Sequence, residues 1–231
     1  MVKALFIGSH CDDCEWMAGG TTVLLRKAKV QVHYLYIFGR HRQARKQTSY
    51  IEAGKRASGI LSVELHLLDF HPQQIKGSPV KISSVIFEKM QEIKPQMVFI
   101  QPPRDYMVDH LVVAKASCHA TSKYLRNNMG EVYAMESPAC PFPFVDIIVD
   151  IGGEFERVRK ALMNYCLIDV AFGKGLVKTK KGLALLRGEQ RDRVQYGEAF
   201  KLVKNGPLFK KLLKEKLKFT SSPLEKEEAV Y

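Results

Sequence analysis

The stretch KALFIGSHCDDCEW, residues 3–16, decides the fold of this chain because an apolar run passes directly into a polar turn. Residues 3–8 have the β-branched and aromatic content of a buried strand. Similar apolar runs follow at residues 30–38, 63–70 and 96–102. Helical patterns fall between the runs, around residues 15–28, 46–59 and 79–94. This alternation predicts βαβ units and therefore an α/β fold with a mostly parallel sheet.

The second half of the chain continues the pattern and then becomes more helical. Helical patterns cover residues 111–126, 154–167, 182–194 and 207–219. Strand patterns cover residues 131–138 and 144–151, and residues 197–204 suit a short strand or a helix. We expect one domain over residues 1–203, with a Rossmann-like sheet flanked by helices and a more helical C-terminal third. A basic C-terminal helix and tail would follow at residues 204–231.

Composition narrows the class of protein. With 231 residues, of which 46% are hydrophobic, the chain can bury a sizeable core. No apolar run has the length of a membrane span, and the first apolar segment is too short for a signal peptide, so we expect a cytoplasmic protein. The five cysteines stand at scattered spacings, which favours reduced thiols. Although the formal net charge is +12, no nucleic-acid-binding motif accompanies it, and nucleic acid is not an expected partner.

Two acidic clusters that contain histidine follow the first and fourth predicted strands. Parallel strands present their carboxyl ends at one edge of a sheet, where ligands bind, so the two clusters should meet there. His10, Asp13 and His110 could supply two nitrogens and a carboxylate, which is the donor set of a catalytic zinc site with one open position. Asp12 could then act as a general base.

Two other interpretations of the first cluster stay open at this point. Asp12 and Asp13 could cap the following helix by accepting its free backbone N–H groups. Cys11 and Cys14 have the C-x-x-C spacing of redox proteins. The redox interpretation is disfavoured, because the two intervening aspartates would raise the pKa of the thiols and oppose thiolate formation.

The chain resembles the LmbE-like, or PIG-L, zinc-dependent N-deacetylases. The motifs that carry the resemblance are HCDDCEWMAGGTT at 10–22, DYMVDH at 105–110, MESP at 135–138, FVDI at 144–147 and ALLRGEQRDRVQYGEAF at 184–200. The resemblance implies a hydrolase that removes the acetyl group from an N-acetylamino sugar or its conjugate in glycan, lipid-linked sugar or natural-product biosynthesis. It also implies zinc bound by His10, Asp13 and His110, with Asp12 as the general base.

One position departs from the family pattern. Met107 stands where the second family motif carries a histidine, which is thought to stabilise the oxyanion or to protonate the leaving amine while the neighbouring aspartate, here Asp109, orients it. A thioether cannot donate a hydrogen bond. Either the enzyme is slow, or another donor such as Tyr106 or His71 replaces the histidine, or the protein binds a sugar ligand without hydrolysing it.

The remaining predictions concern the surroundings of the site. By the resemblance, Arg45, Met107 and Arg187 lie near the substrate, although ordinary ion pairing would equally explain the two arginines. His33 and His66 fall inside strand patterns and are expected to be packed or edge residues rather than ligands. The basic segment at residues 207–219 has an apolar face that is compatible with a membrane surface, with packing on the domain or with a homo-oligomer contact.

Overall fold

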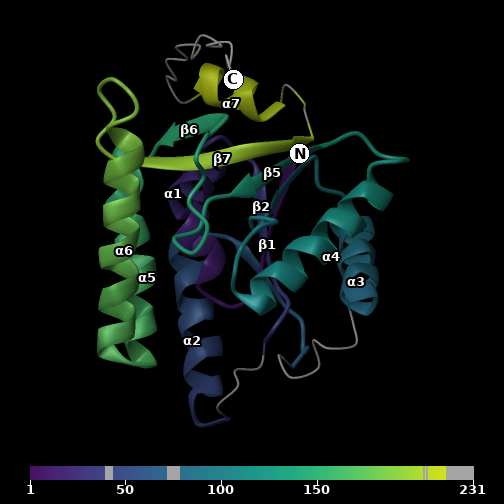
Figure 1. Cartoon of the computed structure of the whole chain (residues 1–231), viewed down its shortest axis with the longest axis horizontal. Coiled ribbons are helices and arrows are strands. Elements are labelled where there is room, and N and C mark those ends of the chain that lie inside the picture. Colours follow the sequence, from purple (N-terminus) through teal and green to yellow (C-terminus); the bar gives the residue numbers. More distant parts are fainter. Residues whose placement is uncertain (40–43, 72–78, 205, 207, 217–231) are drawn as a thin grey trace, which may run out of the picture.

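The computed structural model describes residues 1–39, 44–71, 79–204, 206 and 208–216, with the side chains of 44–49 and 215–216 left out of the description. Its centre is a seven-stranded sheet of order β3-β2-β1-β4-β5-β7-β6 (Figure 1). The strands are β1 Lys3–Gly8, β2 Gln31–Tyr36, β3 Glu64–Leu67, β4 Met97–Ile100, β5 Glu131–Met135, β6 Ile147–Asp150 and β7 Gly197–Lys204. The α-helices are α1 Asp13–Lys27, α2 Ala44–Leu61, α3 Pro79–Ile93, α4 Val108–Tyr124, α5 Phe155–Met163, α6 Val170–Gly188 and α7 Leu208–Lys216. The α/β fold class is confirmed.

The pairing of the strands shows where the sheet is parallel. The five strands from β3 to β5 pair in parallel, as expected of βαβ units, whereas β7 runs antiparallel to both β5 and β6. Residues 197–204 are therefore a strand, and this strand joins the last third of the chain to the parallel part. All four residues of β4 are buried, because helices cover both faces of the sheet.

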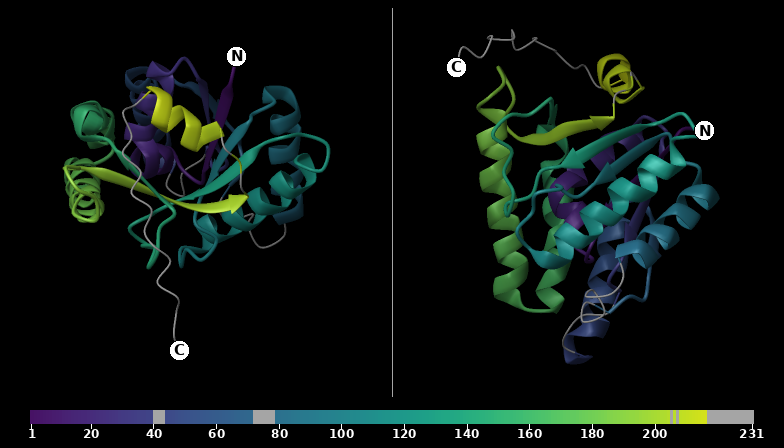
Figure 2. Two further views of the ribbon diagram at one scale, coloured as in Figure 1. Left: turned by 90° about the horizontal axis from the view of Figure 1, so that it is seen from above. Right: turned by 45° about the vertical axis from the view of Figure 1, so that its right-hand side comes forward.

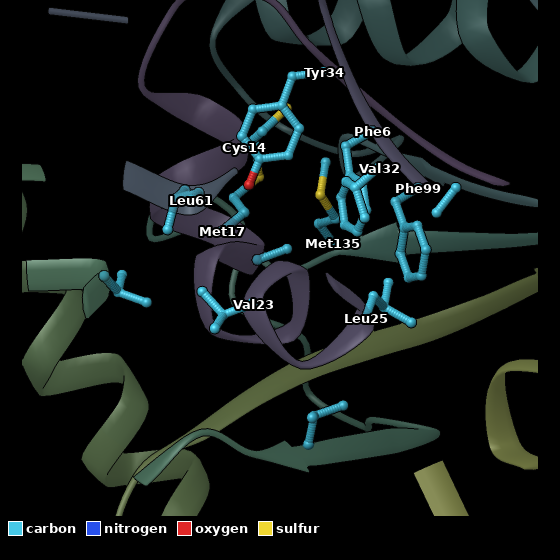
Figure 3. Packing of buried hydrophobic residues seen from close by; sticks show 14 of the residues in the cluster. Phe6, Cys14, Met17, Val23, Leu25, Val32, Tyr34, Leu61, Phe99 and Met135 are labelled. Atoms are coloured by element: carbon cyan, nitrogen blue, oxygen red, sulfur yellow. The ribbon is translucent and has the colours of Figure 1, made fainter. Parts of the chain in front are cut away.

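Two layers of helices enclose the sheet, as Figure 2 shows from two directions. Helices α3 and α4 cover one face, and α1, α2, α5 and α6 cover the other. On the second face Phe6 and Phe99 stack with ring centroids 4.2 Å apart, and Tyr34, Met135 and Leu25 pack around them (Figure 3). These contacts fix β1 beside β4, so that the loops following both strands open at the same edge of the sheet.

Helix α6 differs from its predicted bounds. It begins at Val170 rather than near residue 182, and it ends at Gly188. Its three internal glycines lower the intrinsic helix propensity and hide the start from a pattern search. The fold favours the helix nonetheless, because Asp169 caps it by accepting the Phe172 N–H at 2.9 Å. A Cβ at Gly173 would lie 2.5 Å from the Cys166 backbone nitrogen, so the close approach of this turn requires glycine.

Helix α7 packs on the domain. Its apolar residues Phe209, Leu212 and Leu213 are buried in the core, and the Phe209 ring lies 4.9 Å from the Tyr133 ring. The Glu131 carboxylate accepts the Phe209 N–H at 3.0 Å at the start of the helix. Because these apolar side chains are buried in the domain, the described side chains of residues 208–214 do not support the membrane interpretation. Residues 207 and 217–219 of the predicted segment lie outside the described residues. Across the described residues, every helix is too short or too polar to cross a bilayer.

Candidate active site

A cavity of about 370 Å³ opens beside the loops that follow β1 and β4. It is lined by His10, Asp12, Asp13, Trp16, Met17, Tyr50, Met107, Asp109, His110, Ser137, Pro138, Ala139, Phe172, Leu176 and Thr179. The two acidic clusters are thus brought together at the carboxyl ends of the parallel strands, where an open α/β sheet binds ligands.

The three predicted metal ligands meet in this cavity. His10, Asp13 and His110 each offer one donor atom, and the three atoms lie within 4.8 Å of one another. One oxygen of Asp13, Oδ2, is held by the backbone N–H groups of Ser9 at 2.7 Å and His10 at 2.9 Å. The Gln101 amide at 2.9 Å is its third donor. The other oxygen lies 3.4 Å from Nε2 of His110, so Asp13 is fixed by one oxygen and faces the centre with the other.

A buried aspartate that the sequence analysis did not single out orients His110. Oδ2 of Asp105 lies 3.1 Å from Nδ1 of His110 and also accepts the Ser137 hydroxyl at 2.9 Å. Its second oxygen accepts the Met107 N–H at 2.9 Å. Carboxylates on the far nitrogen of a ligand histidine fix the ring and its tautomer. The signal was present in the sequence, since Asp105 stands five residues before His110 in the same motif.

Nearby carboxylates raise the pKa of His10 and of His110. Burial, the largest influence, lowers the pKa of His110, but the charges of Asp13 and Asp105 outweigh it and raise that pKa to about 9. The pKa of His10 is also raised, because its contact with Asp109, Oδ2 to Nε2 at 3.1 Å, and the charge of Asp13 outweigh burial. A site whose negative charge stabilises imidazolium also stabilises a bound cation. The donor set and its charge therefore fit a divalent metal ion.

Asp12 lines the cavity and does not cap the helix. It occupies the position before α1, yet its side chain makes no capping hydrogen bond, and Asp13 binds residues that precede the helix. Burial and then the charge of Asp13 raise the pKa of Asp12 to about 7. The capping interpretation is therefore wrong, and a carboxyl that titrates near neutrality suits a general base.

Glu15, which follows the first acidic cluster in the sequence and does not line the cavity, is a fully buried carboxyl. Glu15 accepts the hydroxyls of Tyr36 and Tyr165, the latter at 3.2 Å, and burial raises its pKa to about 8. Cys11 and Cys14 are buried beside it, and burial together with the charge of Glu15 raises the pKa of both thiols well above the usual range. Raised thiol pKa values are the opposite of what redox thiolates need.

The three predicted substrate residues have three different outcomes. Met107 lines the cavity and is 42% exposed. Arg187 does not reach the cavity: it is buried, its Nε donates to Glu136 at 2.8 Å, and a terminal nitrogen donates to the Phe142 carbonyl at 2.7 Å. Its prediction as a substrate residue is therefore not supported. The side chain of Arg45, in the first turn of α2, lies outside the described residues.

The lining includes a phenol that the sequence analysis missed. Neither Tyr106 nor His71 is among the lining residues, but Tyr50 is. Burial, followed by the charges of Asp12 and Asp13, raises the pKa of Tyr50, so the phenol keeps its proton. Tyr50 lies in α2, which follows the second strand, and its place near the carboxyl edge was the available signal.

One wall of the cavity is apolar and rigid. It comprises Trp16 and Met17 of α1 with Phe172 and Leu176 of α6. The Trp16 indole N–H donates to the Leu176 carbonyl and to the Thr179 hydroxyl, both at 3.0 Å. These two bonds hold the indole in place, so the wall is preformed for an apolar or aromatic-stacking part of a ligand.

Comparisons with known proteins show which family profile and which solved structures this chain matches. The sequence profile of the PIG-L family, described as GlcNAc-PI de-N-acetylase, matches residues 5–121, and a search of curated protein sequences found no match. Among solved structures, the 4-carboxy-2-hydroxymuconate hydratase GalB from Pseudomonas putida KT2440 is similar with a TM-score of 0.75 at 20% identity, covering 89% of this chain and 98% of that one.

Two deacetylases are also similar in structure. The N,N'-diacetylchitobiose deacetylase from Pyrococcus horikoshii has a TM-score of 0.72 at 19% identity, covering 87% of this chain and 83% of that chain. A teicoplanin deacetylase in its zinc-inhibited form has a TM-score of 0.70 at 14% identity, covering 89% of this chain and 100% of that chain. At such identities the likeness concerns the fold, whereas the profile spans half of the sequence, and the chain belongs to the PIG-L family.

Proposed function

We propose that this protein is a zinc-dependent amidohydrolase that removes the N-acetyl group from an N-acetylamino sugar or its conjugate. The observation that carries the proposal is the meeting of His10, Asp13 and His110 in one cavity with Asp12 beside them, in a chain of the PIG-L family. Two imidazoles and one carboxylate form the donor set of catalytic zinc sites that keep a position open for water or substrate.

The reaction is the hydrolysis of an amide. Zn²⁺ held by His10, Asp13 and His110 would polarise the carbonyl group and lower the pKa of water. Asp12 accepts a proton from the attacking water, whose oxygen forms the new bond to the carbonyl carbon. The C–N bond then breaks, the proton passes from Asp12 to the leaving nitrogen, and acetate and a free amine are released. A pKa near 7 lets Asp12 serve as base and then as acid.

Tyr50 is the proposed replacement for the family histidine that Met107 displaces. It lines the same cavity as Met107 and keeps its phenolic proton, because burial and the charges of Asp12 and Asp13 disfavour ionisation. A protonated hydroxyl can donate to the negative oxygen that develops during amide hydrolysis, which Met107 cannot do. Its ring packs near Phe172, with ring centroids 6.0 Å apart, so the donor is held on the apolar wall.

The apolar wall supports a sugar conjugate as the substrate. Trp16 and Phe172 offer aromatic faces to the apolar face of a sugar ring, and Met17 and Leu176 extend that surface. A cavity of about 370 Å³ lies within the range of small-molecule sites. We therefore expect the acetylated amino group to lie at the metal cluster and the group attached to the sugar to contact the apolar wall.

The test is acetate release from a panel of N-acetylglucosamine conjugates with aryl, alkyl and lipid groups. The purified protein is assayed with Zn²⁺ beside Asp12→Asn and a control carboxyl variant, Glu156→Gln, on the exposed face of α5. We expect Asp12→Asn to lower kcat by about 10²–10⁴-fold with zinc still bound, and the control to match the wild type.

Two other functions are separate outcomes of the same experiment. Met107 brings a side chain with no donor to the cavity, which favours a protein that binds acetylated sugars without turnover. That outcome would appear as saturable conjugate binding with no acetate from any conjugate, and it would overturn the proposal. Since a hydratase shares the fold, turnover of an unsaturated 2-hydroxy acid in place of the amides would overturn it as well.

A further inference from the structure

A second cluster of ligand-type side chains lies outside the cavity. We infer that His33, Glu64 and His66 bind a transition-metal ion, with Zn²⁺ as the best fit, between strand β2 and the edge strand β3. None of the three residues lines the cavity, and the inference does not depend on the proposed deacetylase activity. Such an ion would bridge the edge strand β3 to its neighbour β2.

The register of the sheet brings the three residues together. His33 is the Cα partner of Glu64, and Leu35 is the partner of His66, in a parallel pairing. Side chains two residues apart on a strand share a face, so Glu64 and His66 project on the same side as His33. The 31 positions that separate His33 from Glu64 in the sequence conceal this arrangement.

The distances match those of a metal-binding triad. His33 Nδ1 lies 3.0 Å from His66 Nε2 and 3.5 Å from Glu64 Oε2. His66 Nε2 lies 3.6 Å from Glu64 Oε1. Bonds of about 2.0–2.1 Å to a tetrahedral ion separate its ligand atoms by about 3.3 Å. The three separations bracket that value, so an ion could enter with small side-chain shifts and keep a fourth position for water.

The hydrogen bonding of the ring nitrogens also favours a metal-ligand role for His33 and His66. His33 is buried, and its Nε2 has no hydrogen-bond partner, so only the nitrogen that faces the other two residues is engaged. The facing nitrogens of His33 and His66 form a histidine–histidine hydrogen bond, so one of the two rings already directs a lone pair towards the centre of the triad.

The charged groups around His33, Glu64 and His66 determine how tightly this triad would bind a metal ion. Lys3 and Arg26 face His33, and Lys89 faces His66, but Lys89 is paired with Glu92 at 2.6 Å. Glu64 supplies the negative charge inside the triad, and its side chain is 54% exposed, which gives an ion access from solvent. This triad contains one carboxylate, whereas several carboxylates surround the three ligands in the cavity. It should therefore bind zinc more weakly than His10, Asp13 and His110.

The experiment counts ions per chain. Metal is removed with a chelator, the protein is dialysed against Zn²⁺, and bound zinc is measured by elemental mass spectrometry. We expect two ions for the wild type, one for His110→Gln, one for His66→Gln and none for the double variant. His119→Gln, which changes an exposed histidine outside both clusters, should keep two.

A second measurement guards against loss of folding. In the His110→Gln background, added Zn²⁺ should raise the midpoint of thermal unfolding, and Glu64→Gln should weaken that response about tenfold in zinc concentration while leaving the metal-free midpoint unchanged. Equal zinc content in wild type, His66→Gln and Glu64→Gln would overturn the inference. Loss of zinc from His110→Gln alone concerns the cavity site, so failure of one proposal is distinct from failure of the other.

Discussion

Two histidine clusters belong to different parts of the same sheet, one in the cavity after β1 and β4 and one between β2 and β3, and the two clusters differ in their surroundings. The cavity cluster lies at the carboxyl ends of β1 and β4, where acidic loops converge. The edge cluster, His33, Glu64 and His66, lies within β2 and β3, where His33 pairs with Glu64 and Leu35 pairs with His66. Each offers two imidazoles and one carboxylate within 4.8 Å.

The difference lies in what surrounds the ligands. Around the cavity, Asp13 and Asp105 raise the pKa of His110 to about 9, and Asp12 stands beside the ligands with a cavity before it. At the edge, burial lowers the pKa of His33, and none of the three residues lines the described cavity. Under the two proposals, the triad alone suffices for metal binding, whereas turnover requires an additional base and space for a substrate.

The largest expected effect is a loss of activity, and it should follow substitution in the cavity cluster but not in the edge cluster. His110→Gln should lower acetate release roughly a thousandfold, because Lewis-acid stabilisation is worth several kcal/mol. His66→Gln should leave kcat within about twofold of the wild type. Steady-state acetate assays at saturating conjugate give the comparison, and a large loss in both variants would contradict the division between the clusters.

The next largest effect is expected from loss of the Tyr50 hydroxyl in the cavity. Tyr50→Phe should lower kcat by about 10²–10³-fold if Tyr50 donates to the developing oxyanion, with KM nearly unchanged. Met107→His in the Tyr50→Phe background should recover part of that loss, because it restores the donor of the family motif. If Tyr50→Phe is as fast as the wild type, the donor is another group.

A smaller effect is expected from the residue that orients His110. Asp105→Asn should weaken zinc binding at the cavity by about 10–100-fold, because the amide is a poorer acceptor for the Nδ1–H of His110. Zinc retention against a graded chelator measures this directly. Unchanged zinc affinity in this variant would show that Asp105 acts only through Ser137 and the Met107 backbone.

Much of this organisation could be predicted from sequence. The alternation of apolar runs and helical patterns defines the parallel sheet, and the sheet predicts that His10 and His110 meet at its carboxyl edge. Asp105 and Tyr50 were missed for a different reason. The positions of Asp105, in the motif of His110, and of Tyr50, in the helix after the second strand, were available signals, but their contacts in the site depend on loops and helices that periodicity does not encode.

Tertiary contacts also decide features that a local pattern leaves open, and among those that follow only the start of helix α6 was predicted wrongly. Helix α6 starts early because tertiary packing outweighs its glycines, and the apolar face of α7 is covered by a core that no local pattern reveals. The edge cluster depends on strand register, which the sequence does not state. The prediction that His33 and His66 are packed or edge residues agrees with their places in β2 and β3, and only the strand pairing shows that they lie beside Glu64.

The smallest effect on activity is expected from substitution of Arg187. This substitution tests whether a buried ion pair outside the cavity lining contributes to stability alone. Its guanidinium pairs with Glu136, whose Oε1 also accepts the Phe142 N–H at 2.7 Å near the loop that lines the cavity. Arg187→Met leaves Glu136 buried and unpaired, which should lower the free energy of unfolding by about 3–5 kcal/mol. At a temperature where the variant stays folded, KM should remain within about twofold of the wild type. Chemical denaturation and acetate assays measure the two quantities, and a large rise in KM with unchanged stability would return Arg187 to the substrate site.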